Sequence, residues 1–568
     1  MRIVYSIIGA LVAGILIAVG IVNYRVYREL QTAQTKSQTT QVSTEKPVLI
    51  PDNSMISDDE LKISKRQMWS DLQRKLKDTV VQVFAQIAEF NWLEPYKTPN
   101  QYEATGTAFF INDQGELITN AHVVDQAKVL FIQIPSLGKR RFEVEVVGVS
   151  PERDLALLKL KEHDNQELKK DLNRTSIPYL KLGNSDTIYR ADKLMALGFP
   201  LGQQGLKSTT GVVSGREHIE GQHFIQISAA LNKGNSGGPS LNSIGEVIGV
   251  NSAIIQNAQN VGYIIPINEV RLFLDQVRSM PATTSVKLLR KPYLGLLYKN
   301  GSEMLTKFLG NPLPGGLYIV EVYKSSPLAK AGIQGGDMIY KINGNTVDIY
   351  GEMNVPWSAE DKVSIVDYIS RLKVGQDITL DYYRKGVAKS TTFKFSQSEV
   401  PPVHIMYPGY EKVDYEVIGG LVVMPLTINH IVLIGKYVPD LLEYSDIRKN
   451  REPRLIVTHI LLNSPASRSR TIGAGAVIAQ VNGQKVTTLD ELRKVVPQSL
   501  KTGYLTLRTV ESVLVVMPFD EVMRDERQLS ATYFYPLSSL YKNLAQVYQS
   551  DKAVGQAPKA PIEVQQTK

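Results

Sequence analysis

Hydrophobic positions in the middle of the chain come in short runs, each closed by Gly, Pro, Asn or Asp. About ten such runs fill residues 106–268. Short strands that recur at this spacing are typical of a β-barrel or β-sandwich. A helix is expected to follow at residues 268–277. The predicted strands are Thr107–Ile111, Leu117–Thr119, Val129–Ile134, Phe142–Val149, Leu155–Leu160, Lys193–Gly198, Ser208–Ser214, Phe224–Ser228, Val247–Asn251 and Val261–Ile265.

The chain begins with an uninterrupted apolar stretch. Residues 3–22 carry no charge, and about 20 apolar residues are enough for a helix to cross a bilayer. The apolar region of a cleaved signal peptide is shorter, roughly 7–15 residues, so residues 1–24 are predicted to be an uncleaved transmembrane anchor. The flanking charges do not decide its orientation. Polar residues make 25–57 a flexible linker, and apolar spacings of three, four and seven predict a helical segment within 58–103.

Two later stretches, 290–398 and 410–520, share a faint internal repeat. In each, a Ser-Pro step is followed by apolar strands that flank an Asn-Gly pair, at Asn343-Gly344 and at Asn482-Gly483. An Asn-Gly pair between apolar runs predicts a β-hairpin. A helical stretch follows in both copies, so the repeat indicates a duplicated α+β module. The remaining residues, 521–568, are expected to form a C-terminal extension with a disordered tail.

Composition narrows the chemistry. The chain has no cysteine, which excludes a disulfide framework, a cysteine nucleophile and a zinc ribbon. The 64 Lys and Arg residues exceed the 56 Asp and Glu residues by 8 in a chain of 568. That excess is modest and lacks the dense basic patch of a nucleic-acid-binding protein. We expect no metal, no cofactor and no nucleic-acid partner.

The candidate catalytic residues lie in three segments of the β-rich region. Ser236 is flanked by glycines, and glycine permits the tight turn that exposes a hydroxyl. The backbone N–H groups of Gly234, Asn235 and Ser236 are candidates for an oxyanion hole. His122 directly follows a predicted strand, and Asp154 opens an apolar one, where it could orient the imidazole. The chain order His, Asp, Ser is that of the chymotrypsin arrangement.

Two other acids and a second catalytic pattern compete with this assignment. Asp125 and Asp192 are rival acids, but Asp125 lies only three residues from the histidine and Asp192 does not open an apolar strand. The serine also satisfies the Gly-x-Ser-x-Gly pattern of α/β hydrolases. Its base would then follow the serine, at His404, His430 or His459. That fold alternates strands with helices, which the pattern here does not.

Residues 104–280 resemble the trypsin-like protease domain of the HtrA (Deg) family. The resemblance implies two six-stranded barrels with the site between them, His122 as base, Asp154 as orienting acid and Ser236 as nucleophile. The family's oxyanion-forming segment maps onto residues 233–236. The runs that carry the resemblance are Gly106–Phe109, Thr119–Val124, Asp154–Leu158, Leu197–Gly202, Thr210–Ser214, Ala229–Pro239 and Gly245–Asn251.

The same resemblance suggests a specificity pocket. In this family the S1 pocket is lined by the segment before the serine and by nearby strands, where Ile227 and Leu231 are candidates. Both are apolar, and no acid is placed to pair with a basic side chain. We therefore predict cleavage after small or medium aliphatic residues such as Val and Ala.

The two repeated modules resemble the PDZ domains of the same family. The run Tyr293, Leu294, Gly295, Leu296 matches the carboxylate-binding loop, which presents N–H groups to a peptide C-terminus while the peptide adds a strand. In the second module only Gly419–Val422 is a weak candidate, so peptide binding and an assembly role both stay open there. The insertion at 347–361 and the degenerate second module resemble the plant-type Deg branch.

The fold class expected from all of this is mostly β: a chymotrypsin/trypsin-like double β-barrel, then two PDZ-like α+β modules, with one N-terminal transmembrane helix. The function expected is that of a membrane-anchored serine endopeptidase acting on unfolded or damaged proteins outside the cytoplasm, on the periplasmic side if bacterial. The resemblance also implies a homotrimer or larger assembly, partly through the segment that holds Phe90, Trp92 and Tyr96. Alternatives are a chaperone or adaptor with an idle protease site, and a serine esterase.

Overall fold

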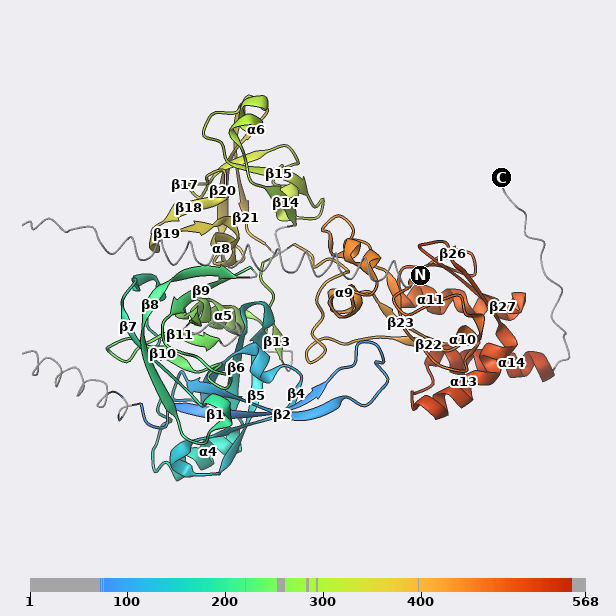
Figure 1. The fold of residues 1–568 in the computed structure, drawn as a ribbon, viewed down its shortest axis with the longest axis horizontal. Helices are drawn as coiled ribbons and strands as arrows, with labels where there is room; N and C mark the ends of the chain where they lie inside the picture. The colour runs from blue at the N-terminus through green and yellow to red at the C-terminus, as the bar shows by residue number, and fades with distance from the viewer. Residues whose placement is uncertain are drawn as a thin grey trace, which may run out of the picture. The chain divides into compact units, whose positions relative to one another are not determined.

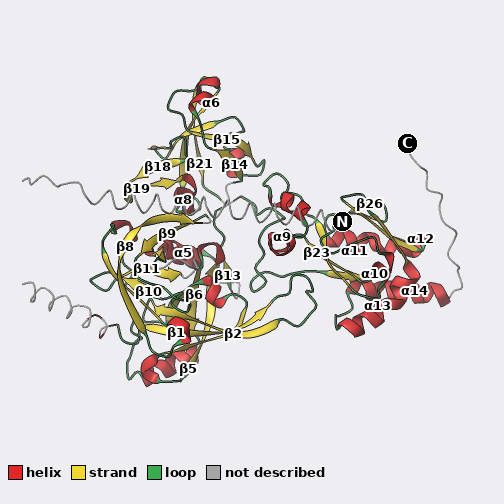
Figure 2. Cartoon of the chain, viewed as in Figure 1, coloured by secondary structure: helices red, strands yellow, loops and turns green. Residues whose placement is uncertain are grey.

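Two closed β-barrels are followed by two smaller modules in the computed structural model (Figures 1 and 2). The predicted anchor, 1–24, and linker, 25–57, lie outside the described residues. Within the described part, no helix combines the length and apolar character needed to cross a bilayer. The residues that the structure describes are 72, 74 and 76–553, except 220, 253–260, 282–285, 293–294 and 397.

The first barrel has six strands in the order β5-β4-β1-β2-β3-β6, and pairing between β5 and β6 closes it. The strand β13 (Lys287–Leu288) adds to β5 in parallel. A short helix, α3 (Ala121–Val124), and a longer one, α4 (Glu162–Asp171), lie in its loops. The six strands are β1 (Val80–Glu89), β2 (Asn100–Phe110), β3 (Glu116–Thr119), β4 (Ala127–Gln133), β5 (Arg141–Ser150) and β6 (Leu155–Leu160).

The second barrel is also closed and six-stranded, in the order β10-β11-β12-β9-β8-β7. The helix α5 (Ile267–Ser279) packs Phe273 and Val277 into a core shared with strands of both barrels. All ten predicted strands overlap strands of the structure, so the double barrel is confirmed. The strands are β7 (Lys193–Gly198), β8 (Lys207–Ile219), β9 (Gln222–Ile227), β10 (Pro239–Leu241), β11 (Val247–Ser252) and β12 (Gly262–Pro266).

The helical segment predicted within 58–103 is wrong from Val80 onward, although residues 72 and 74 are helical. From Val80 the chain is strand β1, and β1 pairs with β2 over ten residues. Val83 and Ile87 also fit a helical spacing, but they are β-branched, and most of β1 is buried on both faces. Burial on both faces removes the alternation that would have marked a strand. The barrel thus begins at Val80 and not at residue 104.

The first PDZ-like module is an antiparallel sheet in the order β14-β15-β16-β20-β21, with β17 (Asn345–Thr346) paired to β16. The predicted insertion, 347–361, largely forms the hairpin of β18 (Glu352–Val355) and β19 (Ser358–Ser364). Its main elements are β14 (Leu296–Lys299), α6 (Glu303–Phe308), β15 (Leu317–Val322), α7 (Pro327–Lys330), β16 (Met338–Ile342), α8 (Ile365–Ser370), β20 (Asp377–Arg384) and β21 (Val387–Lys394).

The second module repeats this plan with an added strand, in the order β22-β23-β24-β25-β27-β28. Its strands are β22 (Glu416–Ile418), β23 (Leu421–Pro425), β24 (Leu455–Ile460), β25 (Val477–Val481), β26 (Gln484–Lys485), β27 (Tyr504–Thr509) and β28 (Leu514–Pro518). Its helices are α9 (Ile428–Ile434), α10 (Pro465–Ser469), α11 (Leu489–Val495), α12 (Ser499–Thr502), α13 (Phe519–Tyr533) and α14 (Ser539–Ala553).

The C-terminal extension, 521–568, is folded as far as Ala553. Helix α13 and helix α14 follow β28 directly, and Val522, Tyr541 and Leu544 are buried in the module's core. Their apolar residues form one stripe on otherwise polar helices, which is how a surface helix packs. The rest of the predicted tail lies outside the described residues.

The tip of the β1–β2 hairpin is packed against the second PDZ-like module. Trp92 meets His430 edge to face, with ring centroids 5.2 Å apart, and Tyr96 meets Tyr535 at 5.7 Å. Phe90 packs in the same cluster as Trp92. These are the aromatic residues expected at a trimer interface, and here they make contacts within the chain.

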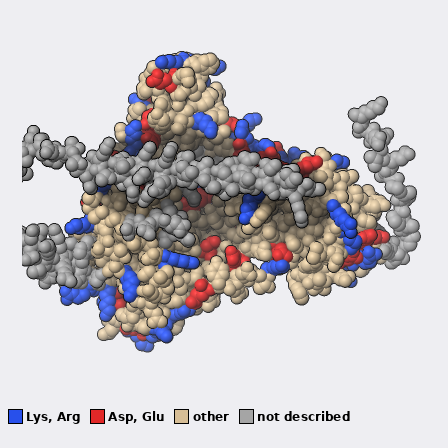
Figure 3. Space-filling model, in the orientation of Figure 1, with Lys and Arg blue, Asp and Glu red and all other residues tan. Residues whose placement is uncertain are grey.

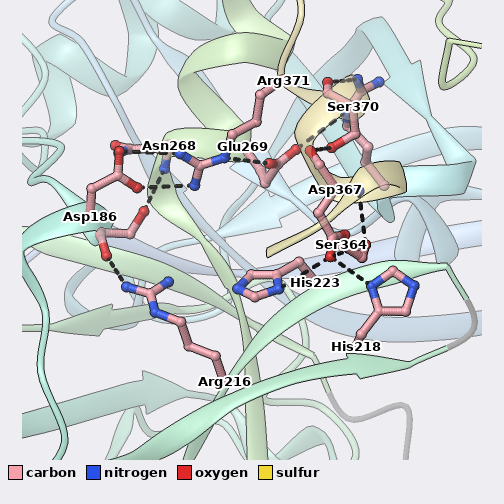
Figure 4. Close-up of polar contacts among 12 residues, drawn as sticks. Asp186, Arg216, His218, His223, Asn268, Glu269, Ser364, Asp367, Ser370 and Arg371 are labelled. Carbon is pink, nitrogen blue, oxygen red and sulfur yellow. Dashed lines mark hydrogen bonds and ion pairs between the residues drawn. The ribbon is translucent and has the colours of Figure 1, made fainter. Parts of the chain in front are cut away.

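Helix α8 of the first module rests on the second barrel through charged groups (Figure 4). The Asp367 carboxylate lies 3.0 Å from His218 Nδ1 on β8 and 3.9 Å from His223 Nδ1 on β9. Arg371, just after α8, pairs with Asp186 at 3.0 Å. An ionic contact of this kind responds to pH because histidine titrates near neutrality.

The pKa values of the two histidines shift in opposite directions. The hydrogen bond to Asp367 raises the pKa of His218, although partial burial opposes it. Burial lowers the pKa of His223 to about 4, so this ring is neutral at physiological pH. A raised pKa in the docked state means that the imidazolium of His218 stabilises docking below pH 6.5. That contribution disappears as the pH rises through the raised pKa.

We therefore expect the first PDZ module to separate from the barrel more often at pH 8 than at pH 6. Cysteines introduced at the exposed Ser214 and Lys389 would carry a fluorescent pair, since the chain has no other cysteine. Energy transfer should fall between pH 6 and pH 8 in the parent protein. His218→Asn should remove this pH dependence, whereas the same change at the exposed His163 should keep it. Transfer that is independent of pH in the parent would contradict the expectation.

Candidate active site

His122 and Asp154 meet at the end of the first barrel. His122 lies on α3, directly after β3, and Asp154 stands between the turn η2 (Pro151–Arg153) and β6 with φ of +52°. The imidazole Nδ1 is 2.9 Å from both carboxylate oxygens, and the His122 backbone N–H donates to Oδ1 at 3.0 Å. The carboxylate thus holds both the ring and the backbone of the histidine.

The neighbours of Asp154 fix it in turn. Asn120 donates its side-chain amide to the Asp154 backbone carbonyl at 2.9 Å, and the Ser252 hydroxyl is 3.4 Å from Oδ2. Burial lowers the pKa of His122, but the hydrogen bond and charge of Asp154, aided by Asp125, raise it overall. The geometry favours a ring with its proton on Nδ1 and its Nε2 available as a base.

The two rival acids take other roles. Asp125 is partly buried, which raises the pKa of its carboxyl group, and it accepts a hydrogen bond from Gln126 at 3.2 Å. Asp192 accepts the backbone N–H of Tyr189 at 2.8 Å in a loop of the second barrel. Of the three acids considered, Asp154 is the one bonded to the imidazole of His122.

Ser236 lies in the loop between β9 and β10, and the backbone carbonyls of residues 233–236 accept hydrogen bonds. Thr107 on β2 donates its backbone N–H to the Ser236 carbonyl at 2.9 Å and its hydroxyl to the Gly234 carbonyl at 2.7 Å. The Lys233 carbonyl accepts from the Leu201 N–H at 2.7 Å. Because a peptide group is planar and trans, the Gly234 N–H points opposite to that carbonyl. Among the described residues, none accepts a hydrogen bond from it.

Two glycines let this loop approach the rest of the site. Gly234 has φ of +99°, and a Cβ there would lie 2.4 Å from the Phe199 carbonyl oxygen. Gly237 has φ of +84°, and its Cβ would lie 2.1 Å from the Thr107 carbonyl oxygen and 3.1 Å from the Asn120 nitrogen. Since Asn120 is two residues before His122, the serine loop of one barrel abuts the histidine segment of the other.

The predicted S1 residues differ in exposure. Ile227 is fully buried among the side chains of the second barrel, and Leu231 is only partly buried against the same cluster. A Cβ on Gly262 would lie 3.0 Å from an atom of each. Leu231 is therefore the one of the pair that is open to a bound side chain.

Half of the predicted carboxylate-binding loop is described. Tyr293 and Leu294 lie outside the described residues. Gly295 has φ of +65°, and its carbonyl accepts the Tyr323 N–H at 2.7 Å. Leu296 begins β14 and is partly buried. The loop thus leads straight into the edge strand of the sheet.

Arg153, which directly precedes Asp154, has no role predicted from the sequence. Its side chain is 1% exposed, and it lies 3.6 Å from Glu269 on α5 and 3.2 Å from the Ser370 carbonyl at the end of α8. A buried guanidinium needs such partners. An arginine next to an acid carries no signal of burial, so only the fold could reveal this link between the first PDZ module and the site.

Three family models match the chain in the order of these domains. The first is a trypsin-like peptidase domain at residues 106–250, and two PDZ domain models follow at 292–395 and 406–536. Their order agrees with the two barrels and the two modules of the structure.

Figure 3 shows basic and acidic side chains interspersed over the visible face.

Curated relatives match over most of their length. A probable periplasmic serine endoprotease DegP-like of Chlamydia trachomatis is 28% identical over 435 residues, covering 74% of this chain and 76% of that protein. The periplasmic serine endoprotease DegP of Escherichia coli K12 is 25% identical and covers 73% and 77%. Among solved structures, an HtrA-type protease AlgW with decapeptide is 23% identical, covering 59% of this chain and 99% of that one, with a TM-score of 0.45. On the domain matches and the two curated relatives, the chain is a serine endoprotease of the DegP/HtrA type, with a trypsin-like peptidase domain followed by two PDZ domains.

Proposed function

We propose that this endoprotease cleaves peptide bonds with Ser236 as nucleophile, His122 as general base and Asp154 as the acid that orients the base. The observation that carries the proposal is the bond of the His122 Nδ1 to the Asp154 carboxylate at 2.9 Å. With Nδ1 so held, Nε2 takes the Ser236 proton as Oγ attacks the scissile carbonyl carbon. The same proton then passes to the leaving amine, and water hydrolyses the acyl-enzyme.

The loop of Ser236 supplies the electrostatic part of the mechanism. The N–H groups of Gly234 and Ser236 would bind the oxyanion, and Asn235 would space them. Support comes from the Lys233 carbonyl, which is held by the Leu201 N–H, since this turns the Gly234 N–H the opposite way. Donors fixed in advance cost no reorganisation when charge develops.

The proposed substrates are unfolded or damaged proteins, as the resemblance to the HtrA proteases implies. The first PDZ module would bind chain ends along β14, at the edge of its sheet. The relatives named above are periplasmic endoproteases. We propose the same compartment here, with residues 1–24 as a membrane tether.

The plant-type branch rests on the insertion, and the relatives named above are bacterial. A homotrimer is implied by the family resemblance, although Phe90, Trp92 and Tyr96 pack within the chain. An adaptor with an idle site would suppress aggregation without cleavage, and an esterase would hydrolyse small esters only.

Ser236→Ala and Asp154→Asn should each lower cleavage of an unfolded protein by roughly 10⁴-fold or more. The double variant should lose little more, since the residues act as a unit. Asp125→Asn is the matched control and should retain most activity. Cleavage products identified by mass spectrometry provide the measurement, and equal cleavage by Ser236→Ala and the parent would refute the mechanism.

Gly234→Ala should lower kcat by about 10²–10³-fold, the usual effect of losing one oxyanion donor. The new Cβ would meet the Phe199 carbonyl oxygen at 2.4 Å, so the loop must move. Gly138→Ala is the control for the backbone strain of replacing a glycine with positive φ, because a Cβ at that position would have nothing within 4 Å. Single-turnover rates would separate the two, and an unchanged rate for Gly234→Ala would remove the oxyanion role from this loop.

Leu231→Gly should shift cleavage from Val and Ala toward larger residues such as Leu and Phe, because it removes the more exposed apolar side chain of the predicted pocket. The shift should be at least about tenfold, as expected for a change of several methylene groups. Sequencing of cleavage sites in an unfolded substrate measures it. An unchanged site profile would place the pocket elsewhere.

A further inference from the structure

The two PDZ modules repeat one order of elements, so most elements of one have a counterpart in the other. Strands β14, β15, β16, β20 and β21 correspond in order to β23, β24, β25, β27 and β28, and helix α8 corresponds to α11. One local contact fixes the alignment. The Gly295 carbonyl accepts the Tyr323 N–H at 2.7 Å, and the Gly420 carbonyl accepts the Leu461 N–H at 2.8 Å. Among the described residues of the first module, β22 has no counterpart.

Strand β22 occupies the edge on which a peptide would be bound. A PDZ ligand adds antiparallel to the strand that follows the carboxylate-binding loop, and that strand is β14 in the first module and β23 in the second. The described part of the first module has no strand paired to the outer edge of β14. In the second, the pairs are Glu416 with Val423, Val417 with Val422, and Ile418 with Leu421.

The loop itself is folded into a hairpin turn. Gly419 and Gly420 have φ of +60° and +86°, and two central residues with positive φ make the two-residue turn that joins tight hairpins. In the second module the loop is therefore the hairpin turn that connects β22 to β23. Its N–H groups are therefore no longer arranged around a free peptide end.

A carboxylate already lies on this turn. The Gly419 N–H donates to Glu526 Oε2 of helix α13 at 3.0 Å, and the Tyr535 hydroxyl donates to Oε1 at 2.6 Å. Glu526 is 1% exposed. By the alignment, Gly419 corresponds to Leu294, within the predicted carboxylate-binding loop of the first module. The chain thus provides its own carboxylate where a peptide terminus would bring one.

Helix α11 holds β22 in place. Arg493 donates to the Glu416 carboxylate at 2.8 Å, to Asp414 at 2.7 Å and to the Tyr415 carbonyl at 3.1 Å. The Glu416 side chain is fully buried, and an unpaired buried charge would be strongly destabilising. Ile418 shares the module's core with Leu492 of α11. The strand therefore lies where the ligand of a PDZ groove lies, between the edge strand and the helix.

Burial shows the same contrast between the modules. All three residues of β22 and the first four of β23 are buried, whereas no residue of β14 is. We propose that strand β22 is an internal ligand that fills the peptide groove of the second PDZ module, so that chain ends are bound by the first module alone. The second half of this statement rests on the proposed peptide-binding function of the first module.

Hydrogen exchange of the full-length parent protein tests both halves separately. The probe is a set of decapeptides ending in Val, Leu, Ile or Phe with free carboxylates, and their amidated forms are the control. Without peptide, every amide of β23 should exchange slowly, and peptide should change its rate by less than about twofold. The amides of β14 that point away from β15 should exchange fast and slow at least tenfold with the free-acid peptides.

A β23 that exchanges like an open edge, or that gains protection from peptide, would overturn the internal ligand. A β14 that stays unprotected while β23 is slow would instead reject peptide binding by the first module. Each result thus points to one of the two statements.

A variant that releases β22 gives the converse test. Arg493→Glu places a negative charge against Glu416 and Asp414, and should raise exchange in β23 at least tenfold and allow peptide to restore protection there. Lys494→Glu makes the same charge change on the exposed face of α11 and should do neither. If Arg493→Glu fails to fold, by circular dichroism, the exchange pattern of the parent still decides. A folded Arg493→Glu protein in which β23 remains slow would contradict the proposal.

Discussion

The hydrogen bonds of Thr107 hold the candidate site together. This residue belongs to the first barrel, yet its N–H and hydroxyl bind the carbonyls of Ser236 and Gly234 in the second. The proposed acid and base, Asp154 and His122, come from one barrel and the proposed nucleophile, Ser236, from the other, so neither barrel alone contains the candidate site. These contacts between the barrels position the loop of Ser236, whereas a bond within the second barrel, from the Leu201 N–H to the Lys233 carbonyl, sets the direction of the Gly234 N–H. The proposed chemistry is thus a property of how the two barrels are joined.

Contacts with the first PDZ module reach the same region. Arg153 binds the end of α8 and is covalently next to Asp154, while Asp367 touches two histidines of the second barrel. Any displacement of α8 therefore changes the surroundings of the residue that orients His122. The end of α8 and the candidate site are thus close in space, although some 200 residues of sequence separate them.

The elements that could be predicted from the sequence are those in which apolar residues lie on one face or in which apolar runs end at turn residues. Ten strands alternate or end at turn residues, and His122, Asp154 and Ser236 lie in segments with strong local signatures. Strand β1 was mistaken for a helix because burial on both faces erases its alternation. Arg153 and Thr107 could not be assigned roles, since their partners are distant in sequence. Strand β22 was missed because three residues carry too little pattern to distinguish a strand from a linker.

The packing of α13 and α14 into the second PDZ module has a consequence for the order of folding. Core side chains such as Val522 and Leu544 come after all of the module's strands. During synthesis the barrels and the first module can complete their cores while the chain is still growing. The second module must wait for nearly the last described residues. Because the β1–β2 hairpin tip packs on that module, the first two strands that the structure describes receive their final contacts only after α14 has been synthesised.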